Sequence, residues 1–213
     1  MKWQVNYALK NFNDSSDRTR AEYVEKELIK IEVEEQPDVL ALISDAHRID
    51  KSLAEQYVRD NPDIDFICGY RKSCVWEGEA IYFLEEHKIG WGNFGTLHSA
   101  ARQGNANFAE HKVFLFAARL IHQYGVVQHV KREFDRVFRV TLKSGREVRI
   151  GLIPDYEPTA DNVRSLWEQF GPLDIAWNFN PNGEPTSAAK AAGDELGCKV
   201  LMTADIKEYL HTL

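Results

Sequence analysis

Apolar residues in the first part of the chain recur at two different spacings, which predict helices alternating with strands. Within the charge-rich residues 15–35, four apolar residues follow helical spacing and predict a helix that Pro37 closes. They are Ala21, Val24, Leu28 and Ile31. Residues 38–44 are nearly continuously apolar, which is typical of a short buried strand.

A second strand is predicted at residues 64–68, and the segment before it carries helix signals. Asp50 can cap a helix that Asn61 and Pro62 stop near Asp60. The strand–helix–strand order predicts that strands 38–44 and 64–68 are parallel. A further helix is expected at residues 79–87, followed by a glycine-rich loop at 90–95 and a short helix from about Leu97.

The polar segment 103–107 is the best boundary between two regions, so we expect an N-terminal α/β region at 1–105 and a second domain at 106–213. Asn107 is a suitable N-cap, and Glu110 stands three residues later, as in a capping box. The sequence therefore predicts a helix from Asn107 to about Tyr124, with Gly125 at its end.

Three strands of an antiparallel meander follow, at about 126–133, 136–142 and 146–153. The even-numbered positions of the second and third strands are apolar, so a hairpin must place them on one face. A three-residue loop with Gly145 in the left-handed position achieves this by pairing Val140 with Val148.

The remaining residues predict a helix, a strand, a second helix, a strand and a terminal helix. Thr159 caps the first helix, and Thr186 caps the second. Strands are expected at 173–179 and 199–202, and Asp205 is the expected cap of the last helix. No internal repeat is visible in the sequence.

Composition indicates a globular chain of 213 residues with 44% hydrophobic and 28% charged residues. No apolar run approaches the ~18 residues needed to cross a bilayer, so we expect no membrane association. The three cysteines are scattered and odd in number, and the N-terminus lacks a signal-like apolar region. A reduced cytoplasmic protein is therefore expected.

The charge is unevenly distributed. Residues 129–149 hold seven bases and three acids, giving +4, whereas the remainder of the chain carries −11. Such a basic stripe on an acidic body suits an anionic ligand that is bound at one place. A strand pair with a solvated face explains the same charges, and both interpretations remain open.

The helix–β–β–β–helix–β order of residues 106–213, with its Thr-capped helix and short final helix, resembles the core of the PD-(D/E)xK, or restriction-endonuclease-like, superfamily and its Mrr-like members. The resemblance covers about half of the chain. It implies a carboxylate at the start of the second strand, which Asp135 supplies, and an acidic-x-Lys motif where the third strand returns beside it.

The predicted register decides which residues can fill that motif. Glu147 and Arg149 look similar to Glu-x-Lys, but Asp135 lies opposite Ile153, roughly 20 Å from Glu147 at ~3.3 Å per residue. Asp155 and Glu157 do return beside Asp135. The resemblance therefore implies a Mg²⁺ or Mn²⁺ site at Asp135, Asp155 and Glu157, with Glu110 assisting.

The chain departs from the family pattern at Glu157, where a lysine is usual, so the site is either active or degenerate. A structural explanation exists for each acid. Asp135 can pair with Arg136, Glu110 can belong to the capping box, and Asp155 and Glu157 suit a turn and a helix N-terminus.

Three other motifs give weaker indications of function. Asp45-Ala46-His47 after a strand resembles the first motif of calcineurin-like metallophosphoesterases, but the later motifs are absent. Gly90-x-Gly92-x-x-Gly95 is spelled like a dinucleotide fingerprint but does not open a β-α-β unit. The Asn178–Gly183 turn could hold an anion and is more often plain turn chemistry.

Three functional hypotheses follow. The first is a metal-dependent nuclease or nuclease-derived protein acting on nucleic acid, in which Arg136, Arg139 and Arg149 contact phosphates. The second is a non-enzymatic scaffold or binding subunit, with a decayed site, that joins a protein partner in a nucleic-acid-processing or defence complex. The third is a metallophosphoesterase centred on Asp45 and His47.

Overall fold

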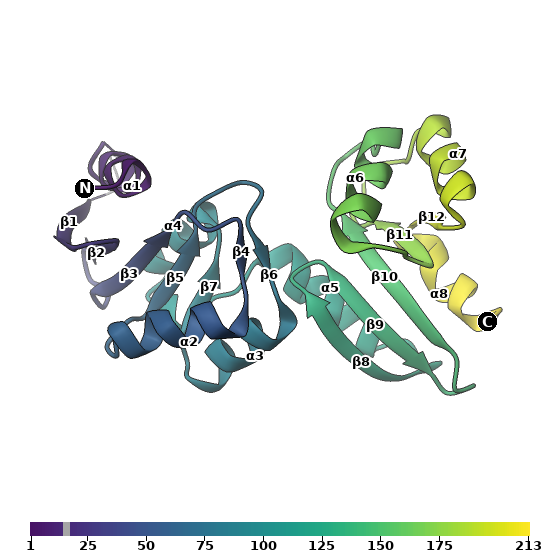
Figure 1. The fold of residues 1–213 in the computed structure, drawn as a ribbon, viewed down its shortest axis with the longest axis horizontal. Helices are drawn as coiled ribbons and strands as arrows, with labels where there is room; N and C mark the ends of the chain where they lie inside the picture. Colours follow the sequence, from purple (N-terminus) through teal and green to yellow (C-terminus); the bar gives the residue numbers. More distant parts are fainter. Residues whose placement is uncertain (15–17) are drawn as a thin grey trace. The chain divides into compact units, whose positions relative to one another are not determined.

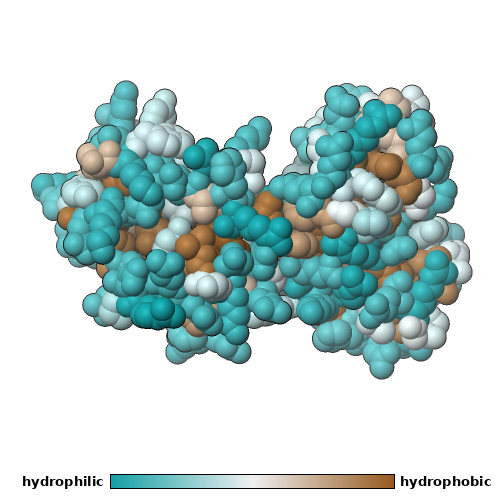
Figure 2. All heavy atoms as spheres, viewed as in Figure 1, coloured by the Kyte–Doolittle hydropathy of each residue, from teal (hydrophilic) through white to brown (hydrophobic). Residues whose placement is uncertain are grey.

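The structure, a computed structural model, describes residues 1–14 and 18–213 and confirms the α/β class. The chain divides into two compact units, Met1–Lys112 (unit 1) and Val113–Leu213 (unit 2). Each unit contains its own five-stranded mixed sheet with accompanying helices (Figure 1). The visible face of each unit is mainly hydrophilic, because the apolar side chains of the strands are buried (Figure 2). No helix in the described part is long and apolar enough to cross a membrane.

Unit 1 is built on a sheet of strand order β1-β2-β3-β5-β7. The pairs β1–β2 and β2–β3 are antiparallel, whereas β3–β5 and β5–β7 are parallel. The sheet strands are β1 Thr19–Glu25, β2 Leu28–Val33, β3 Val39–Ser44, β5 Phe66–Gly69 and β7 Gly90–Gly92. The helices are α1 Trp3–Asn13, α2 Lys51–Asp60, α3 Gly78–Glu86 and α4 Phe94–Arg102, and β4 Arg48–Ile49 pairs with β6 Val75–Trp76 in a small second sheet.

The helix predicted over residues 15–35 is wrong: residues 19–33 form the β1–β2 hairpin, and Ser15–Asp17 lie outside the described residues. The helical spacing was misleading because Val24 is 47% exposed, whereas neighbouring Leu28 and Ile29 are both buried. Cross-strand pairing and burial against the sheet decide this segment, and local periodicity does not report either.

The β-α-β unit is confirmed. β3 and β5 are parallel, and the Asp50 carboxylate accepts a hydrogen bond of 2.8 Å from the backbone N–H of Leu53 at the start of α2. The glycine-rich segment is not a loop throughout, because Gly90–Gly92 forms β7. These glycines therefore do not form a nucleotide-binding turn. Asn93 caps α4, which begins at Phe94 and so earlier than expected.

Helix α5 begins at Lys112 and not at Asn107, so the predicted capping box does not exist. Asn107 lies in the short 3-10 helix η1, Ala106–Phe108, and Glu110 precedes α5. Residues 106–109 pack on unit 1: Ala106 is 4% exposed in its core, and the Trp91 N–H donates to the Ala109 carbonyl (2.9 Å). This packing explains why the division falls after Lys112 instead of after residue 105.

Unit 2 has strand order β12-β11-β10-β9-β8. β8–β9 and β9–β10 are antiparallel, whereas β10–β11 and β11–β12 are parallel. The strands are β8 Val127–Phe134, β9 Val137–Leu142, β10 Glu147–Ile153, β11 Ile175–Asn178 and β12 Lys199–Met202. The helices are α5 Lys112–His122, α6 Ala160–Phe170, α7 Ser187–Leu196 and α8 Thr203–His211.

The predicted register of the meander is confirmed. Val140 pairs with Val148, and the Leu142 N–H donates to the Arg146 carbonyl at 2.8 Å across a loop in which Gly145 has φ +85°. The Leu152 N–H donates to the Arg136 carbonyl at 2.9 Å, which places Asp135 level with Ile153, as expected.

The caps of α6 and α7 are also confirmed. The Thr159 hydroxyl accepts from the Asn162 N–H, and the Thr186 hydroxyl accepts from the Ala189 N–H. The cap of the last helix is different: α8 begins at Thr203 after Met202, and Asp205 lies within its first turn. Asp205 is therefore not the N-cap of α8. Its negative charge in the first turn instead interacts favourably with the positive end of the helix dipole.

The two units share one topology, a repeat that the sequence does not reveal. Apart from β4, β6 and η1, each unit has the order helix, three antiparallel strands, helix, strand, helix, strand, helix. Equivalent residues lie 109 positions apart: α1 begins at Trp3 and α5 at Lys112, and α4 begins at Phe94 and α8 at Thr203. The repeat therefore spans the whole described fold.

Strand register is repeated at the same offset. Ile31 pairs with Val39 as Val140 pairs with Val148, and Ala41 pairs with Phe66 as Ile150 pairs with Ile175. Few residues are identical at this offset. One is an aspartate that accepts a backbone N–H in each unit: Asp65 from Leu40 at 2.8 Å and Asp174 from Arg149 at 2.7 Å.

Candidate functional site

Asp135, the first carboxylate of the predicted site, lies in the turn between β8 and β9 and is 2% exposed. Both of its oxygens are occupied by Arg136, whose Nε lies 3.1 Å from Oδ1 and whose Nη2 lies 2.9 Å from Oδ2. The Arg136 guanidinium also lies over the ring of Phe114, 5.3 Å from its centroid. Such a two-pronged pair neutralises the carboxylate and holds it in place.

The other predicted carboxylates come from the β10–α6 loop and from the segment before α5. Asp155 and Glu157 are exposed in the loop between β10 and α6, and Glu110 belongs to the end of unit 1. Asp155 and Arg136 line one shallow polar pocket, and Asn178 Nδ2 donates to the Asp155 carbonyl at 2.8 Å. Among the described residues, no three His, Cys, Asp or Glu side chains lie close enough together to hold a metal ion.

Two of the three predicted phosphate-binding arginines are paired with one glutamate. Glu133 accepts from Arg139 Nε and Arg149 Nε, each at 2.6 Å, on neighbouring strands. Arg149 also donates to the Pro172 carbonyl (2.7 Å). Burial raises the pKa of Glu133, but the hydrogen bonds from both arginines outweigh burial and leave this pKa below its ordinary value.

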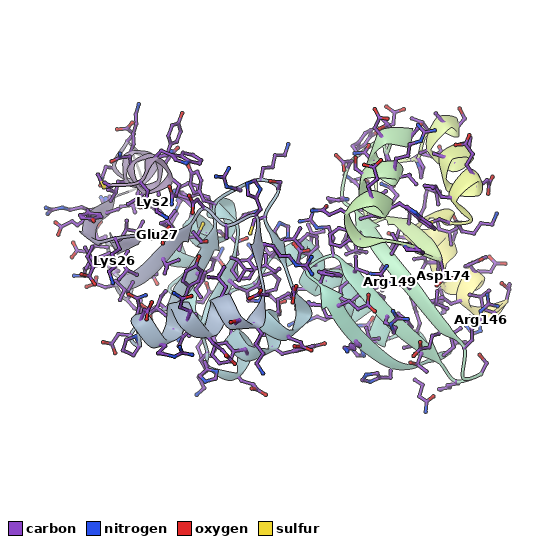
Figure 3. The ribbon with its side chains drawn as sticks, viewed as in Figure 1. Lys2, Lys26, Glu27, Arg146, Arg149 and Asp174 are labelled. Atoms are coloured by element: carbon purple, nitrogen blue, oxygen red, sulfur yellow. The ribbon has the colours of Figure 1, made fainter. Side chains whose placement is uncertain are left out.

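Exposed bases occupy a different part of the meander. Lys131, Lys143 and Arg146 are exposed, and within the described residues none of them forms an ion pair. Figure 3 shows Arg146 near the tip of the β9–β10 hairpin, away from Arg149 and Asp174. Within the meander, the exposed Lys and Arg side chains that are open to an anionic partner are therefore at the β9–β10 hairpin tip and on β8.

The structure brings together a polar cluster in unit 1 that the sequence did not indicate: Lys2, Gln4, Glu27 and Asp45. Lys2 precedes α1, Glu27 lies in the β1–β2 turn, and Asp45 follows β3. Lys2 Nζ lies 2.7 Å from Glu27 Oε1 and 3.5 Å from Asp45 Oδ1 (Figure 3). The hydrogen bond with Glu27 raises the pKa of Lys2 above its ordinary value.

Gln4 is the buried member of this cluster. It is 0% exposed, and its Nε2 lies 3.2 Å from Glu27 Oε1 and 3.3 Å from the Ile43 carbonyl oxygen. Its Oε1 is buried and has no hydrogen-bond partner among the described residues. A buried amide oxygen without a partner carries a free-energy cost of ~1–3 kcal/mol, so it calls for an explanation.

An exposed aromatic surface adjoins the cluster. Trp3 is 51% exposed, Tyr7 is 59% exposed, and the ring centroids of Trp3 and Tyr70 are 5.6 Å apart. Arg71 connects the two features, because its Nε donates to the Asp45 carbonyl and its guanidinium lies 6.0 Å from the Trp3 ring centroid. Flat rings beside charged groups are suited to stacking against a base or another planar ligand.

Of the Asp45-Ala46-His47 motif, only Asp45 belongs to this cluster. His47 is exposed, and its carbonyl accepts from the Val75 N–H (3.0 Å) in the small β4–β6 sheet. Sequence reasoning singled out Asp45 because it follows an apolar strand. It missed Glu27 because a helix was predicted there, and it missed Gln4 because a lone glutamine carries no signal.

Comparison with known proteins gives no relative for this chain. No family model matches it, and neither the curated proteins nor the solved structures contain a significant match.

Proposed function

We propose that this chain is a nuclease-derived protein that binds nucleic acid without cutting it through unit 2, as the binding subunit of a larger nucleic-acid-processing or defence complex. The order of elements in unit 2 supports its derivation from a restriction-endonuclease-like fold. The observation that carries the proposal is the pairing of both Asp135 oxygens with Arg136.

That pairing opposes metal-dependent hydrolysis at the predicted site. Mg²⁺ or Mn²⁺ would need carboxylate oxygens at Asp135, Asp155 and Glu157, and the ion would activate a water molecule beside the phosphodiester. Arg136 occupies the oxygens of Asp135, and its positive charge repels a cation at the same place. The two other acids are exposed in the loop between β10 and α6, whereas Asp135 is buried in its pair with Arg136.

Binding of nucleic acid would use the exposed bases instead of Arg139 and Arg149, which are paired with Glu133. Phosphate contacts come from accessible Lys and Arg side chains, and they make affinity depend on salt. Lys131, Lys143 and Arg146 meet this requirement. Arg139 and Arg149 would serve mainly to hold the strands of the meander together.

A cleavage assay tests the non-cutting part of the proposal. Wild-type protein and Asp155→Asn would be incubated with single- and double-stranded DNA and RNA in Mg²⁺ or Mn²⁺. We expect no cleavage by either protein. Cleavage by the wild type that disappears in Asp155→Asn would contradict the proposal and establish the alternative, a metal-dependent nuclease.

A binding assay tests the remaining part. The fluorescence anisotropy of labelled oligonucleotides would be followed at several salt concentrations for wild type and for Lys143→Ala/Arg146→Ala. We expect the double variant to bind more weakly and to lower the slope of log affinity against log salt by about two. Lys190→Ala/Lys199→Ala, on exposed lysines outside the meander, is the matched control. Equal losses in both double variants, or no binding by the wild type, would contradict the proposal.

A further inference from the structure

The internal repeat gives each unit an exposed aromatic residue at the same place on its first helix. Tyr7 on α1 and Phe116 on α5 are equivalent, and they are 59% and 58% exposed. The repeat also places an aromatic residue directly after the fourth strand of each five-stranded sheet, Tyr70 after β5 and Phe179 after β11. Two aromatic positions are therefore common to both units.

These rings form one aromatic surface in each unit. In unit 2 the ring centroids of Phe116 and Phe179 are 5.7 Å apart. In unit 1 Trp3 connects the two rings, with its centroid 6.5 Å from Tyr7 and 5.6 Å from Tyr70. The residue after β5 or β11 lies at the carboxyl end of parallel strands, which is where open α/β sheets bind ligands.

Packing does not explain why the exposed rings are repeated. Buried residues of similar size recur because equivalent cores need similar side chains, but more than half of Tyr7 and of Phe116 is exposed. Another exposed position of the same helices differs in kind, since Trp3 is matched by Lys112. The aromatic pair therefore indicates that both units use this surface in the same way.

A positive charge accompanies the ring on each helix. Lys10 and Arg119 are equivalent and exposed, and each follows the aromatic residue by three positions, so ring and cation are neighbours on one helix face. Neither residue forms an ion pair within the described part of the chain. Helices α1 and α5 contain no acid, although the whole chain carries a net charge of −7.

Unit 1 adds a second cation to its aromatic surface. The Arg71 guanidinium lies 6.0 Å from the ring centroid of Trp3. The acids beside this surface are Glu27 and Asp45, and Lys2 is paired with both of them. Exposed rings next to cations fit a ligand that combines flat bases with phosphates.

We propose that the aromatic surfaces of both units bind single-stranded nucleic acid, with bases stacked on Tyr7 and Phe116 and phosphates held by Lys10 and Arg119. The inference rests on the nucleic-acid function proposed above and names the single-stranded form as the ligand. The bases of a duplex are stacked on one another, whereas a single strand leaves its base faces open to aromatic side chains. Every base has such a face, so this binding tolerates many sequences.

Fluorescence anisotropy of a labelled single strand and of the matching duplex, measured with the full chain, tests this inference. We expect Tyr7→Ala/Phe116→Ala to weaken binding of the single strand about tenfold or more and to change binding of the duplex less than about twofold. Tyr7→Phe/Phe116→Tyr keeps both rings and should bind like the wild type. Tyr82→Ala, which removes a 41% exposed ring from α3, is the matched control.

Tryptophan fluorescence gives a second readout that a loss of folding would not imitate. Trp3 is one of five tryptophans, and a base stacked on it quenches its emission. We expect the single strand to quench part of the emission of the wild type and to lose this effect in Trp3→Phe. Quenching that persists unchanged in Trp3→Phe would overturn stacking on unit 1.

The same assay separates this inference from the proposal for the hairpin tip. Equal binding of the single strand by wild type and Tyr7→Ala/Phe116→Ala, with weaker binding by Lys143→Ala/Arg146→Ala, would overturn this inference alone and leave a protein partner as the occupant of the rings. Weaker binding by the ring variant alone would support this inference and contradict the hairpin tip. Equal losses for single strand and duplex in the ring variant would also overturn it.

Discussion

At the scale of single residues, the repeat places different side chains in the same backbone conformation. Lys88 and Gly197 occupy equivalent positions, after α3 and after α7, and both have positive φ, +57° and +72°. Glycine adopts this region without a steric cost, whereas a residue with a Cβ pays ~1–2 kcal/mol. Unit 1 therefore carries a conformational strain at Lys88 that unit 2 avoids.

Exchange of these two residues is expected to change stability in opposite directions. Lys88→Gly should raise the free energy of unfolding by about 0.5–1 kcal/mol, after allowance for the greater entropy of glycine in the unfolded chain. Gly197→Ala should lower it by about 1 kcal/mol. Urea denaturation of both variants measures the two changes. Destabilisation by Lys88→Gly would show that the lysine makes a contact that outweighs its strain.

At the scale of elements, Glu133 connects three strands of the meander. Its carboxylate lies on β8 and binds Arg139 on β9 and Arg149 on β10, with side-chain exposures of 16%, 38% and 15%. The paired residues Arg139 and Arg149 lie directly opposite each other across β9 and β10. Two like charges at such a position repel, so the shared glutamate makes this pairing acceptable.

The lowered pKa of Glu133 gives the meander a dependence on pH. A carboxylate whose pKa is lower in the folded state stabilises the fold above its unfolded value, near 4.5, and this stabilisation is lost as pH falls through the folded pKa. We expect the free energy of unfolding to fall more steeply below pH 4.5 in the wild type than in Glu133→Gln. Urea denaturation at roughly ten pH values between about 2.5 and 7 measures this difference.

The control for this prediction is Glu147→Gln. Glu147 also pairs with Arg139, at 3.3 Å, but is 57% exposed, so its loss should leave the pH dependence close to that of the wild type. Parallel stability curves for the wild type and Glu133→Gln would show that another carboxylate governs the acid side.

At the scale of the whole molecule, each unit has the parts of a complete domain. Each has a five-stranded sheet with four α-helices in its described residues, and a cluster of buried residues forms the core of unit 1 around Val5, Phe12 and Phe66. Domains of about 100 residues with their own core commonly fold alone. The equal registers of the two sheets point to the same conclusion, because neither sheet borrows a strand from the other unit.

We therefore expect fragments 1–112 and 113–213 to fold separately. Each should show a cooperative thermal transition by circular dichroism and dispersed amide resonances by NMR. Fragment 1–105 is the matched control: it ends at the boundary that the sequence suggests and lacks both Ala106 and the bond between Trp91 and Ala109, so it should melt at a lower temperature. An unfolded 113–213 fragment would contradict the division into independent units.

The sequence by itself determined most of unit 2. Turn residues, caps and alternating apolar positions are local signals, and together they predicted the meander, its register through Val140 and Val148, and the order of the later helices and strands. In unit 1 the same signals predicted β3, α2 and β5. Each of these features depends on residues that are near in sequence or on side-chain parity along one strand.

Only the tertiary structure decided the β1–β2 hairpin, the repeat and the two charge clusters. The hairpin owes its stability to pairing with β3 and to burial beneath α1, which no local window contains. The repeat is not visible in the sequence because a core accepts many different apolar residues of suitable size. Two units can therefore share one backbone fold while few of their equivalent residues are identical. Gln4, Glu27 and Asp45 come from three separate segments. For Asp135, the sequence allowed either a metal ion or Arg136 as the partner. Distances in the folded chain settle such pairings, since electrostatic and hydrogen-bond energies depend on separation in space and not on separation in sequence.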